Sequence, residues 1–405
     1  MIPKKSPTHV KNTVVINATN IGKNLSGIGI YTLSLLKQFA ARPARLRFIV
    51  YLNRNAAAHI REISFPENFS LKWVSGRLSP DYGFKGHLLR LLFANFLSLK
   101  HRRFPLFTTS QLEAGFFHPN QAITIHDVIP LLFRDFHKQQ YYFFRCLLPL
   151  ALRRAKYVIT PSRHSQQLLH RLYHLPAEKI RMIPNGIQEI YLHSAVSQNS
   201  RREEFILYTG RISPMKNIAG LIKAFSRINQ SLPHQLVIVG ENKAEIEREI
   251  RAGRILREEV ENGRVMFRGQ VSDREMLCLF QRAALLVFPS LYEGFGLPPL
   301  EAMACGCPVV ASNAASLPEV CGNAAYYVNP QSVESIAAGI RKVIGDSKTR
   351  RYLIRKGLLR ARRYRWEDSA RAHLEILERI AVAPEAAAPQ PVFQPGRKSE
   401  TTIPV

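Results

Sequence analysis

Two glutamates, Glu293 and Glu301, flank a glycine-rich turn that lies between an apolar run and a helical pattern opened by proline. A carboxylate in such a turn can accept hydrogen bonds from sugar hydroxyls, and Glu301, about one turn inside the predicted helix, can reach a ribose diol. Gly294 and Gly296 allow backbone amides to approach a ligand closely, because glycine has no side chain in the way. Surface glutamates are common, so the pair indicates a ligand site only because it lies at the carboxyl edge of a predicted sheet.

A second candidate segment begins at Gly210 and carries two cations, Arg211 and Lys216. It follows an apolar run, and Ser213 and Pro214 suit the N-cap and the first position of a helix. Backbone amides at a helix N-terminus, together with the two cations, would bind a diphosphate. On this segment alone, a tight turn with two solvated cations is an equally good interpretation.

Two features of the first half could complete such a site. Gly27 and Gly29 form a glycine turn that enters a predicted helix, so their amides could face phosphates across a cleft. His126 ends a predicted strand, and the following Asp127 could cap a helix or orient the histidine. A lone Gly-x-Gly has little specificity and a lone histidine at a strand end is more often structural, so both assignments depend on the other motifs.

Alternating strand and helix patterns must position these residues. Continuous apolar runs in the second half predict strands that are covered on both faces, as in a parallel sheet. These runs are 205–209, 236–239, 265–268, 284–288, 308–311 and 325–328. After the first of them, one face of a predicted helix carries Ile218, Leu221, Ile222 and Phe225.

The first half shows the same alternation less regularly. Its predicted strands are 14–17, 48–51, 123–126, 157–160 and 180–183, and its predicted helices are 29–40, 141–156 and 162–173. The whole pattern predicts an α/β protein with two doubly wound, Rossmann-like domains.

The charge of the chain is strongly positive, at +27. Residues 1–190 carry 27 Lys and Arg against 8 Asp and Glu, so most of the excess lies in the first half. Such a field attracts nucleic acid, anionic lipid head groups or phosphorylated substrates, although a merely solvated basic surface is also possible. No apolar run is long enough to span a membrane, the N-terminus does not have the pattern of a signal peptide, and the five cysteines are expected to be reduced thiols.

The motifs together resemble one known family. The stretch from Tyr292 to Val310 resembles the Glu-x7-Glu signature of the retaining GT-B glycosyltransferases of family 4, also called glycosyl transferases group 1. Gly210-Arg211 followed by Lys216-Asn217 is similar to the diphosphate motif of that family. Pro184-Asn185-Gly186 and Ser316-Leu-Pro-Glu319-Val also resemble its pattern, and the resemblance covers roughly residues 14–382. It implies a GT-B fold, in which two Rossmann-like domains face each other across a cleft.

The resemblance also implies a domain layout. We expect a nucleotide-sugar donor to bind mainly to the C-terminal domain and an acceptor to bind to the N-terminal one. The expected segments are a basic N-terminal tail (1–12), an N-terminal acceptor-side domain (13–195), a C-terminal nucleotide-sugar-binding domain (196–365), a closing helix (366–382) and a disordered tail (383–405).

Residue roles follow from the same resemblance. Arg211 and Lys216 would neutralise the donor diphosphate and the charge that develops on the leaving nucleotide. Glu293 and His126 would contact the donor sugar, and Glu301 would hold the ribose. The implied catalytic residues are Glu293, His126, Arg211 and Lys216. The implied donor-binding residues are Gly27, Gly29, Gly210, Arg211, Lys216, Glu241, Glu293, Gly294, Phe295, Gly296, Leu297 and Glu301, with Gly240-Glu241 near the base.

The implied chemistry is transfer with retention at the anomeric carbon, in which the acceptor hydroxyl attacks from the face that the diphosphate leaves. The protein would contribute mainly by stabilising the departing diphosphate and an oxocarbenium-like centre. The chain contains no Asp-x-Asp, so no metal-bridged diphosphate is indicated, and neither a metal nor another cofactor is expected.

The substrates are less well defined by the sequence. The runs Ile123–Leu131 and Pro289–Pro299 are most similar to bacterial mannosyltransferases of O-antigen or exopolysaccharide synthesis, so GDP-mannose is the first expectation and UDP-sugars stay open. The expected acceptor is a polysaccharide or a lipid-linked oligosaccharide, and nucleic acid is not an expected partner. A basic nucleic-acid-binding protein is a distant alternative that gives the two glutamates no role. A GT-B-shaped epimerase or phosphorylase is a further alternative.

The segment 84–104 bears on location. It interleaves leucine and phenylalanine with Lys85, Arg90 and Lys100, which fits an interfacial helix on an anionic membrane or, equally, a buried helix with cationic ends. Together with the charge of the first half, it favours a cytoplasmic protein that is peripheral on the inner face of the plasma membrane.

Overall fold

The computed structural model describes residues 12–43, 45–193, 202–240, 243–255, 257–261 and 263–382. The expected basic tail (except residue 12), the expected disordered tail, the expected boundary at 195/196 and the donor-site candidate Glu241 lie outside the described residues. Within the described part, no helix is long and apolar enough to cross a membrane.

The first domain is built on a parallel sheet with the strand order β3-β2-β1-β4-β5-β6-β7. Its strands are β1 Thr13–Asn17, β2 Arg47–Asn53, β3 Phe69–Val74, β4 Leu106–Thr108, β5 Gln121–Thr124, β6 Tyr157–Thr160 and β7 Ile180–Met182. Its helices include α1 Gly27–Ala40, α2 Ala57–Ile60, α3 Gly83–Lys100, α4 Ile129–Leu132, α5 Lys138–Tyr142, α6 Leu148–Arg154 and α7 Arg163–Tyr173.

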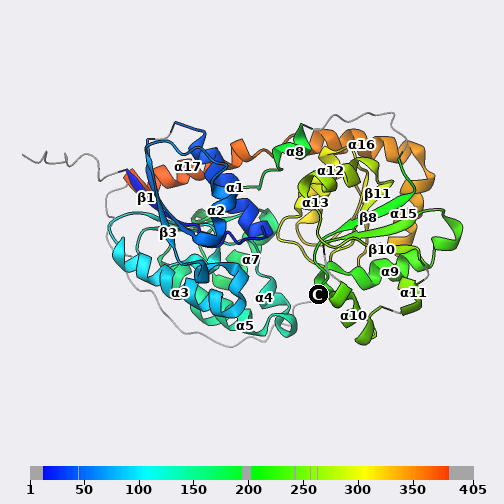
Figure 1. Ribbon diagram of the computed structural model, residues 1–405, viewed down its shortest axis with the longest axis horizontal. Helices are drawn as coiled ribbons and strands as arrows, with labels where there is room; N and C mark the ends of the chain where they lie inside the picture. Colours follow the sequence, from blue (N-terminus) through cyan, green and yellow to red (C-terminus); the bar gives the residue numbers. More distant parts are fainter. Residues whose placement is uncertain are drawn as a thin grey trace, which may run out of the picture.

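The second domain is built on a parallel sheet with the order β10-β9-β8-β11-β12-β13. Its strands are β8 Phe205–Thr209, β9 Gln235–Val239, β10 Val265–Phe267, β11 Leu285–Phe288, β12 Val309–Ser312 and β13 Ala325–Val328. Its helices include α8 Glu189–Leu192, α9 Ile218–Ser226, α10 Lys243–Arg251, α11 Arg257–Glu261, α12 Asp273–Arg282, α13 Leu297–Ala304, α14 Leu317–Cys321, α15 Val333–Gly345 and α16 Ser347–Ala361. The two lobes lie side by side, each with helices around its sheet (Figure 1), so the predicted two-domain α/β fold is confirmed.

The last described helix, α17 Trp366–Val382, returns to the first domain. Figure 1 shows it beside α1, and its Trp366, Leu377 and Ile380 side chains are buried in the same apolar cluster as Val14 of β1. The chain passes between the domains twice, once near Gly186 and once just before Trp366. These two segments are in close contact, since a Cβ on Gly186 would lie 2.2 Å from the Trp366 nitrogen. The glycine of the Pro184-Asn185-Gly186 motif is therefore explained by the close approach of these two segments, which leaves no room for a side chain at position 186.

Two predictions of secondary structure need correction. The strand predicted over 123–126 ends at Thr124, which leaves His126 in the loop that follows β5. The helix predicted over 141–156 is divided by a π-helical segment at Phe143–Leu147 between α5 and α6. Pro149 explains the division, since proline has no amide hydrogen and clashes with the preceding turn. The helix face of Ile218, Leu221, Ile222 and Phe225 is buried as predicted.

Candidate active site

Loops at the carboxyl edges of the two sheets meet between the domains. Ser162, which follows β6, donates a hydrogen bond of 2.7 Å to the Gly294 carbonyl oxygen in the loop after β11. A Cβ on Gly294 would lie 2.5 Å from the His126 carbonyl oxygen and 2.8 Å from the Asp127 Cβ. The structure therefore brings the predicted residues His126 and Gly294 together, and only glycine fits at 294 in this arrangement.

Lys216 and Glu293 form an ion pair in this region. Their Nζ and Oε1 atoms are 2.5 Å apart, and the side chains are 23% and 10% exposed. Since water is largely excluded from the pair, the attraction is stronger than for an exposed pair. The two groups that the sequence proposed for the diphosphate and for the sugar hydroxyls are thus in direct contact.

Asp127 lies within the field of this pair. Its Oδ1 accepts a hydrogen bond of 3.0 Å from the amide of Ile129, the first residue of α4, although the N-cap of that helix is Val128. Burial raises the pKa of Asp127 to about 6, which the nearby Glu293 charge reinforces and the Lys216 charge opposes. Of the two roles that the sequence left open for Asp127, capping is the one supported by a hydrogen bond.

His126 is held in one tautomer. Its Nε2 lies 2.9 Å from the Thr109 carbonyl oxygen, which can only accept, so Nε2 carries the hydrogen and Nδ1 is left as an acceptor in the neutral ring. Burial lowers the pKa of His126 to about 4, so the ring is neutral near pH 7. The Tyr31 ring packs edge-on against it at 4.7 Å between centroids. A neutral acceptor suits contact with a sugar hydroxyl better than it suits proton donation.

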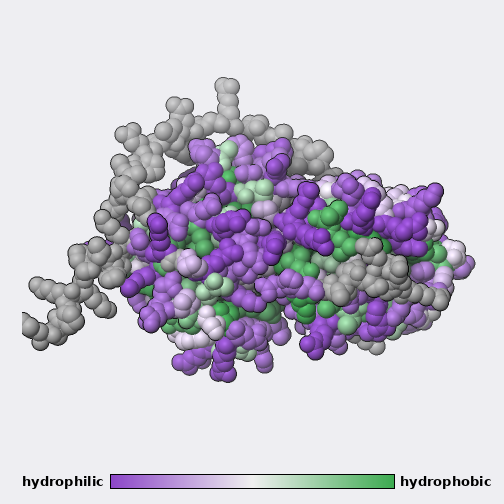
Figure 2. Space-filling view, turned by 90° about the horizontal axis from the view of Figure 1, so that it is seen from above, coloured by the Kyte–Doolittle hydropathy of each residue, from purple (hydrophilic) through white to green (hydrophobic). Residues whose placement is uncertain are grey.

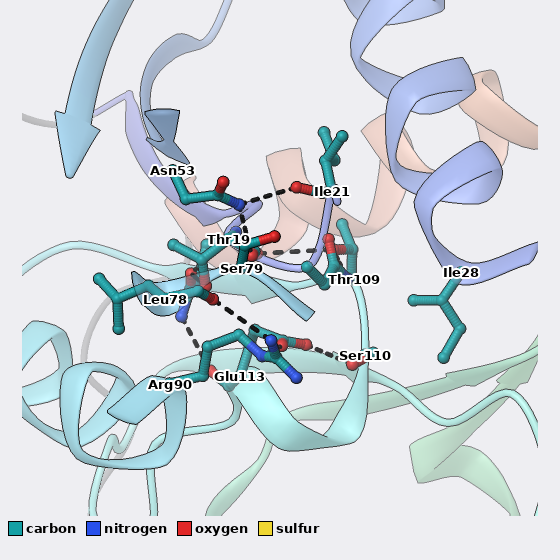
Figure 3. A network of polar contacts seen from close by, with 12 residues as sticks. Thr19, Ile21, Ile28, Asn53, Leu78, Ser79, Arg90, Thr109, Ser110 and Glu113 are labelled. Atoms are coloured by element: carbon teal, nitrogen blue, oxygen red, sulfur yellow. Dashed lines mark hydrogen bonds and ion pairs between the residues drawn. The ribbon is translucent and has the colours of Figure 1, made fainter. Parts of the chain in front are cut away.

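A buried polar network fixes the loop that holds His126 (Figure 3). Asn20 donates a hydrogen bond of 2.9 Å to the Thr109 hydroxyl, and the neighbouring Ser110 hydroxyl donates to Glu113. The Glu113 Oε1 lies 3.1 Å from Arg90 Nε, with the two side chains 0% and 2% exposed. No sequence motif indicated Glu113, and the pattern of residues 84–104 left an interfacial helix and a buried helix equally open for Arg90. The one sequence feature that could have indicated this buried pair is a single arginine among the leucines of a predicted helix.

The glycine turn of the first domain lies at the start of α1. Ser26 is the N-cap, and its hydroxyl accepts from the Gly29 amide at 3.3 Å, so that amide is already used within the protein. Gly27 is exposed, and nothing lies within 4 Å of the position that a Cβ would take there. The expectation that both amides face a phosphate therefore needs correction for Gly29.

The segment after β8 also differs from its prediction. A 3-10 turn spans Pro214–Lys216, and Asn217 then takes a left-handed conformation (φ 55°, ψ 39°), so α9 begins at Ile218 and not near Ser213. The Asn217 side chain fixes this turn by donating to the carbonyl oxygens of Pro289 and Pro330, at 3.2 and 2.6 Å. Lys216, the last residue of this 3-10 turn, forms the ion pair with Glu293.

Gly210 and Gly240 pack against each other at the ends of β8 and β9. Gly210 has φ 145° and Gly240 has φ 121°, and a Cβ on Gly240 would lie 2.7 Å from the Gly210 carbonyl oxygen. Arg211 is exposed, and its charge contributes to a lowered pKa at His137 of the first domain, where burial is the larger cause. The field of Arg211 therefore reaches across the space between the domains.

Hydrogen bonds from Ser316 fix the backbone of the Glu293–Leu297 loop. The Ser316 hydroxyl donates to the carbonyl oxygens of Glu293 and Phe295, at 2.9 and 2.8 Å. The Phe295 side chain is buried against the Tyr364 ring, so its part at a ligand site would be made by its backbone. Gly296 has φ 107° and is the N-cap of α13, which starts at Leu297.

Glu301 lies in α13 and is half-buried. Burial raises the pKa of Glu301 from its ordinary value of 4.5 to about 8, and the Asp273 charge adds to the shift. A ribose diol could donate hydrogen bonds to this carboxyl group.

This shift predicts a pH dependence of stability. Between pH 4.5 and about pH 8 the folded protein retains the Glu301 proton, whereas the unfolded chain releases it, so stability should fall as the pH rises through this window. Glu301→Gln cannot titrate. We therefore expect its Tm to exceed that of the wild type by a margin that grows from about pH 5 to about pH 8 in ligand-free thermal unfolding. Parallel Tm curves would contradict the assignment, and Glu334→Gln on the exposed surface of α15 is the matched control.

Among the described residues, no group of three or more His, Cys, Asp or Glu side chains could hold a metal ion.

Comparisons with known proteins agree with this architecture. The Glycosyltransferase Family 4 profile matches residues 25–189, and the profile described as glycosyl transferases group 1 matches residues 192–360. The O-antigen chain mannosyltransferase B of Escherichia coli is 28% identical over 374 residues, which cover 85% of this chain and 93% of the relative. The O-antigen chain mannosyltransferase RfbU of Salmonella typhimurium is 28% identical over 338 residues, which cover 82% and 90%.

Solved structures share the fold at lower identity. Sucrose-phosphate synthase from Thermosynechococcus elongatus superposes with a TM-score of 0.72 at 21% identity, covering 91% of this chain and 99% of that one. Anabaena HepE in complex with UDP and glucose superposes with a TM-score of 0.69 at 19% identity, covering 90% and 99%. WaaG, a glycosyltransferase involved in lipopolysaccharide biosynthesis, has a TM-score of 0.65 at 16% identity, covering 90% and 99%. These likenesses support the GT-B arrangement of the two domains.

Proposed function

Since the chain belongs to the GT-B glycosyltransferases that join a Family 4 domain to a group 1 domain, we propose that it transfers mannose from GDP-mannose to a polysaccharide or lipid-linked oligosaccharide acceptor with retention at the anomeric carbon. The contact that carries the proposal is the ion pair of Lys216 and Glu293, placed between the domains beside Gly294 and His126. The choice of mannose is supported by relatives named O-antigen chain mannosyltransferases, which match most of the chain.

In this proposal, Lys216 changes its ion-pair partner when the donor binds. The ammonium leaves the Glu293 carboxylate for the donor diphosphate, and Arg211 provides a second positive charge. The released Glu293 then accepts hydrogen bonds from hydroxyls of the donor sugar. Charge that develops on the departing diphosphate is stabilised by the cations already in place, which lowers the barrier to leaving-group departure.

The neutral His126 has a separate role. Its Nδ1 accepts a hydrogen bond from a sugar hydroxyl, because Nε2 is committed to the Thr109 carbonyl. The acceptor hydroxyl attacks from the face that the diphosphate leaves, and the diphosphate oxygen takes its proton. Glu301 accepts hydrogen bonds from the ribose. The ionised carboxylate offers both oxygens for this, so nucleotide binding would favour release of its proton.

Transfer from a UDP-sugar in cell-envelope glycan synthesis is the second candidate. The likeness to HepE, a structure in complex with UDP and glucose, supports it. No residue described above distinguishes a guanine from a uracil, so a binding measurement must identify the base of the donor.

The test is a thermal-shift panel of GDP, UDP, ADP and their sugar conjugates in EDTA. We expect GDP-mannose to raise the Tm of the wild type and of Glu334→Ala, an exposed control on α15, but not that of Glu301→Ala. A shift with a UDP-sugar alone would favour the second candidate. Salt-sensitive binding of DNA without any nucleotide shift would instead favour a nucleic-acid-binding protein.

We further propose that α3 docks on an anionic membrane near a lipid-linked acceptor. Its inner face is made of small residues, Leu97 and the buried Arg90, while its outer face exposes large apolar side chains. The exposed large apolar residues of α3 are Phe84, Leu88, Leu89, Leu92, Phe96 and Leu99. The alternative of a buried helix is therefore wrong for these side chains.

The surroundings of this face support a membrane as its partner. Lys85, Lys100, Arg102 and Arg103 are exposed along and just after α3, so anionic head groups would find cations around the apolar residues. By contrast, the face seen in Figure 2 is mostly hydrophilic, with hydrophobic residues in small groups. An apolar patch rimmed by cations is typical of interfacial binding.

Removing two of the apolar side chains should weaken membrane binding. Leu92 and Leu99 are 61% and 71% exposed, and Leu92→Ser/Leu99→Ser is expected to lower the partition coefficient onto phosphatidylglycerol vesicles about tenfold or more, since each leucine loses its transfer free energy. Cosedimentation measures the effect. Leu359→Ser, at a 53% exposed position on α16 of the other domain, should leave binding unchanged, and equal binding of all three proteins would refute the assignment.

A further inference from the structure

A second contact between the domains involves Glu319, a residue for which the proposed transfer has no role. Its Oε1 accepts a hydrogen bond of 2.9 Å from the Arg163 amide, and its Oε2 accepts one of 3.2 Å from the His164 amide. Glu319 belongs to α14 of the second domain, whereas the two amides open α7 of the first. One carboxylate thus joins the domains through two separate hydrogen bonds.

We propose that Glu319 is a positioning residue that latches the first turn of α7 onto the second domain and so sets the separation of the two sides of the cleft. The inference concerns the closing of the two domains and does not depend on which sugar nucleotide is bound.

The start of α7 is well suited to such a latch. The first amides of a helix have no partner within the helix and carry the positive end of its dipole. Ser162, the N-cap, accepts from the Ser165 amide at 3.1 Å, which leaves the amides of Arg163 and His164 for Glu319. Opening of the domains would return these two amides and the carboxylate to water.

The same end of α7 also touches the loop of the candidate donor site. Besides Ser162, the Ser165 hydroxyl lies 3.3 Å from the Gly294 carbonyl oxygen and donates to it. The His164 ring packs against the Tyr292 ring, with 5.5 Å between centroids. The helix start therefore contacts the residues on both sides of Glu293.

Within the second domain, the latch and the loop form one unit. Ser316, three residues before Glu319, donates to the carbonyl oxygens of Glu293 and Phe295. A Cβ on Gly296 would lie 2.6 Å from Leu317 Cδ2, so the loop and α14 are in close contact. A shift of Glu319 relative to α7 is thereby transmitted to the backbone around Glu293.

The chemistry of a carboxylate explains why glutamate serves here. Both of its oxygens accept, so each of the two amides has a partner. Glutamine has the same length, but it keeps one acceptor and places an NH2 group against the second amide. Glu319→Gln is therefore a probe that changes the latch with little change in shape.

The chain offers a direct readout of domain separation. Cys146 of the first domain and Cys278 of α12 in the second are exposed, whereas Cys305, Cys307 and Cys321 are buried. Nitroxide labels on the two exposed cysteines would report the distance between the domains by pulsed electron spin resonance, with no substrate present.

We expect the labelled wild type to give one narrow distance distribution. Glu319→Gln should shift the ratio of open to closed molecules toward open by about tenfold, because charge-assisted hydrogen bonds contribute more than neutral ones. Glu334→Gln on α15 is the matched control and should resemble the wild type. A distribution for Glu319→Gln identical to that of the wild type would overturn the latch.

A separate measurement excludes simple unfolding as the cause. The fluorescence of Trp73 in β3 and Trp366 in α17 reports on the first domain, and its urea transition should be the same in Glu319→Gln and in the wild type. If the domains open while this transition is unchanged, Glu319 acts on domain position. If the transition moves to lower urea together with the distances, Glu319 acts by stabilising the fold and the latch is refuted.

Discussion

Alanine in place of Lys216 is expected to lower kcat for sugar transfer by about 100- to 1,000-fold, the range observed when one preorganised donor to a developing anion is removed. The Lys216 ammonium lies 2.5 Å from Glu293 and is 23% exposed, so water screens it only partly when it exchanges Glu293 for the diphosphate. Without it, the departing diphosphate loses a nearby positive charge, and the Glu293 carboxylate faces the diphosphate with no cation between them.

The expected loss lies mainly in kcat, because the charge on the leaving group is greatest in the transition state. Steady-state kinetics with the donor identified by the thermal-shift panel would measure it. Lys223→Ala removes an exposed lysine from the neighbouring α9 and should keep near-wild-type activity. A Lys216→Ala enzyme with wild-type kcat would show that the leaving group is stabilised elsewhere.

Loss of the Glu113 carboxylate should cause a large decrease in stability, about 3–5 kcal/mol of the free energy of unfolding, because the buried Arg90 guanidinium would lose its ion-pair partner. Neither side chain is more than 2% exposed, so water cannot replace the missing carboxylate. Urea unfolding of Glu113→Ala followed by tryptophan fluorescence would measure the loss, since Trp73 lies in β3 and Trp366 is buried in the apolar cluster of the first domain.

The double variant Arg90→Met/Glu113→Leu separates charge from packing. An apolar pair of similar volume removes both charges at once, so its stability should lie much closer to the wild type than that of Glu113→Ala. Asp368→Ala removes an exposed partner of Arg371 on α17 and should cost less than about 1 kcal/mol. If Glu113→Ala were as stable as Asp368→Ala, the buried pair would contribute nothing to the fold.

The double variant also reports on the site. Glu113 holds the loop of Ser110 and Thr109, whose carbonyl oxygen fixes the tautomer of His126. A folded double variant with reduced transfer would therefore indicate that the network in Figure 3 positions His126 as well as stabilising the domain.

The architecture could be predicted from the sequence because its strands are apolar and lie between clear helices. β8, β9, β11 and β12 are buried along almost their whole length, so their continuous apolar runs were enough to indicate them. β3 and β4 were not predicted for two different reasons. β3 is a partly exposed edge strand, and β4 has only three residues.

Contacts between residues that are far apart in the sequence could not be predicted in the same way. The spacing of Glu293 and Glu301 indicated a ligand site, but the meeting of Lys216 with Glu293 depends on the left-handed conformation of Asn217, which is stabilised by carbonyl groups far along the chain. The roles of Arg90 and Glu319 depend on partners that are distant in sequence. Motif spacing carries no information about such partners.

Retaining, metal-independent transfer is tested most directly by the anomeric configuration of the sugar that is released from its donor without a metal ion. GDP-α-mannose would be incubated with the protein in EDTA, and the first-formed mannose or mannoside would be followed by proton NMR before mutarotation. We expect an α-configured product from the wild type and a strongly reduced amount of product from Lys216→Ala. A β-configured first product, or release that requires an added divalent cation, would contradict it.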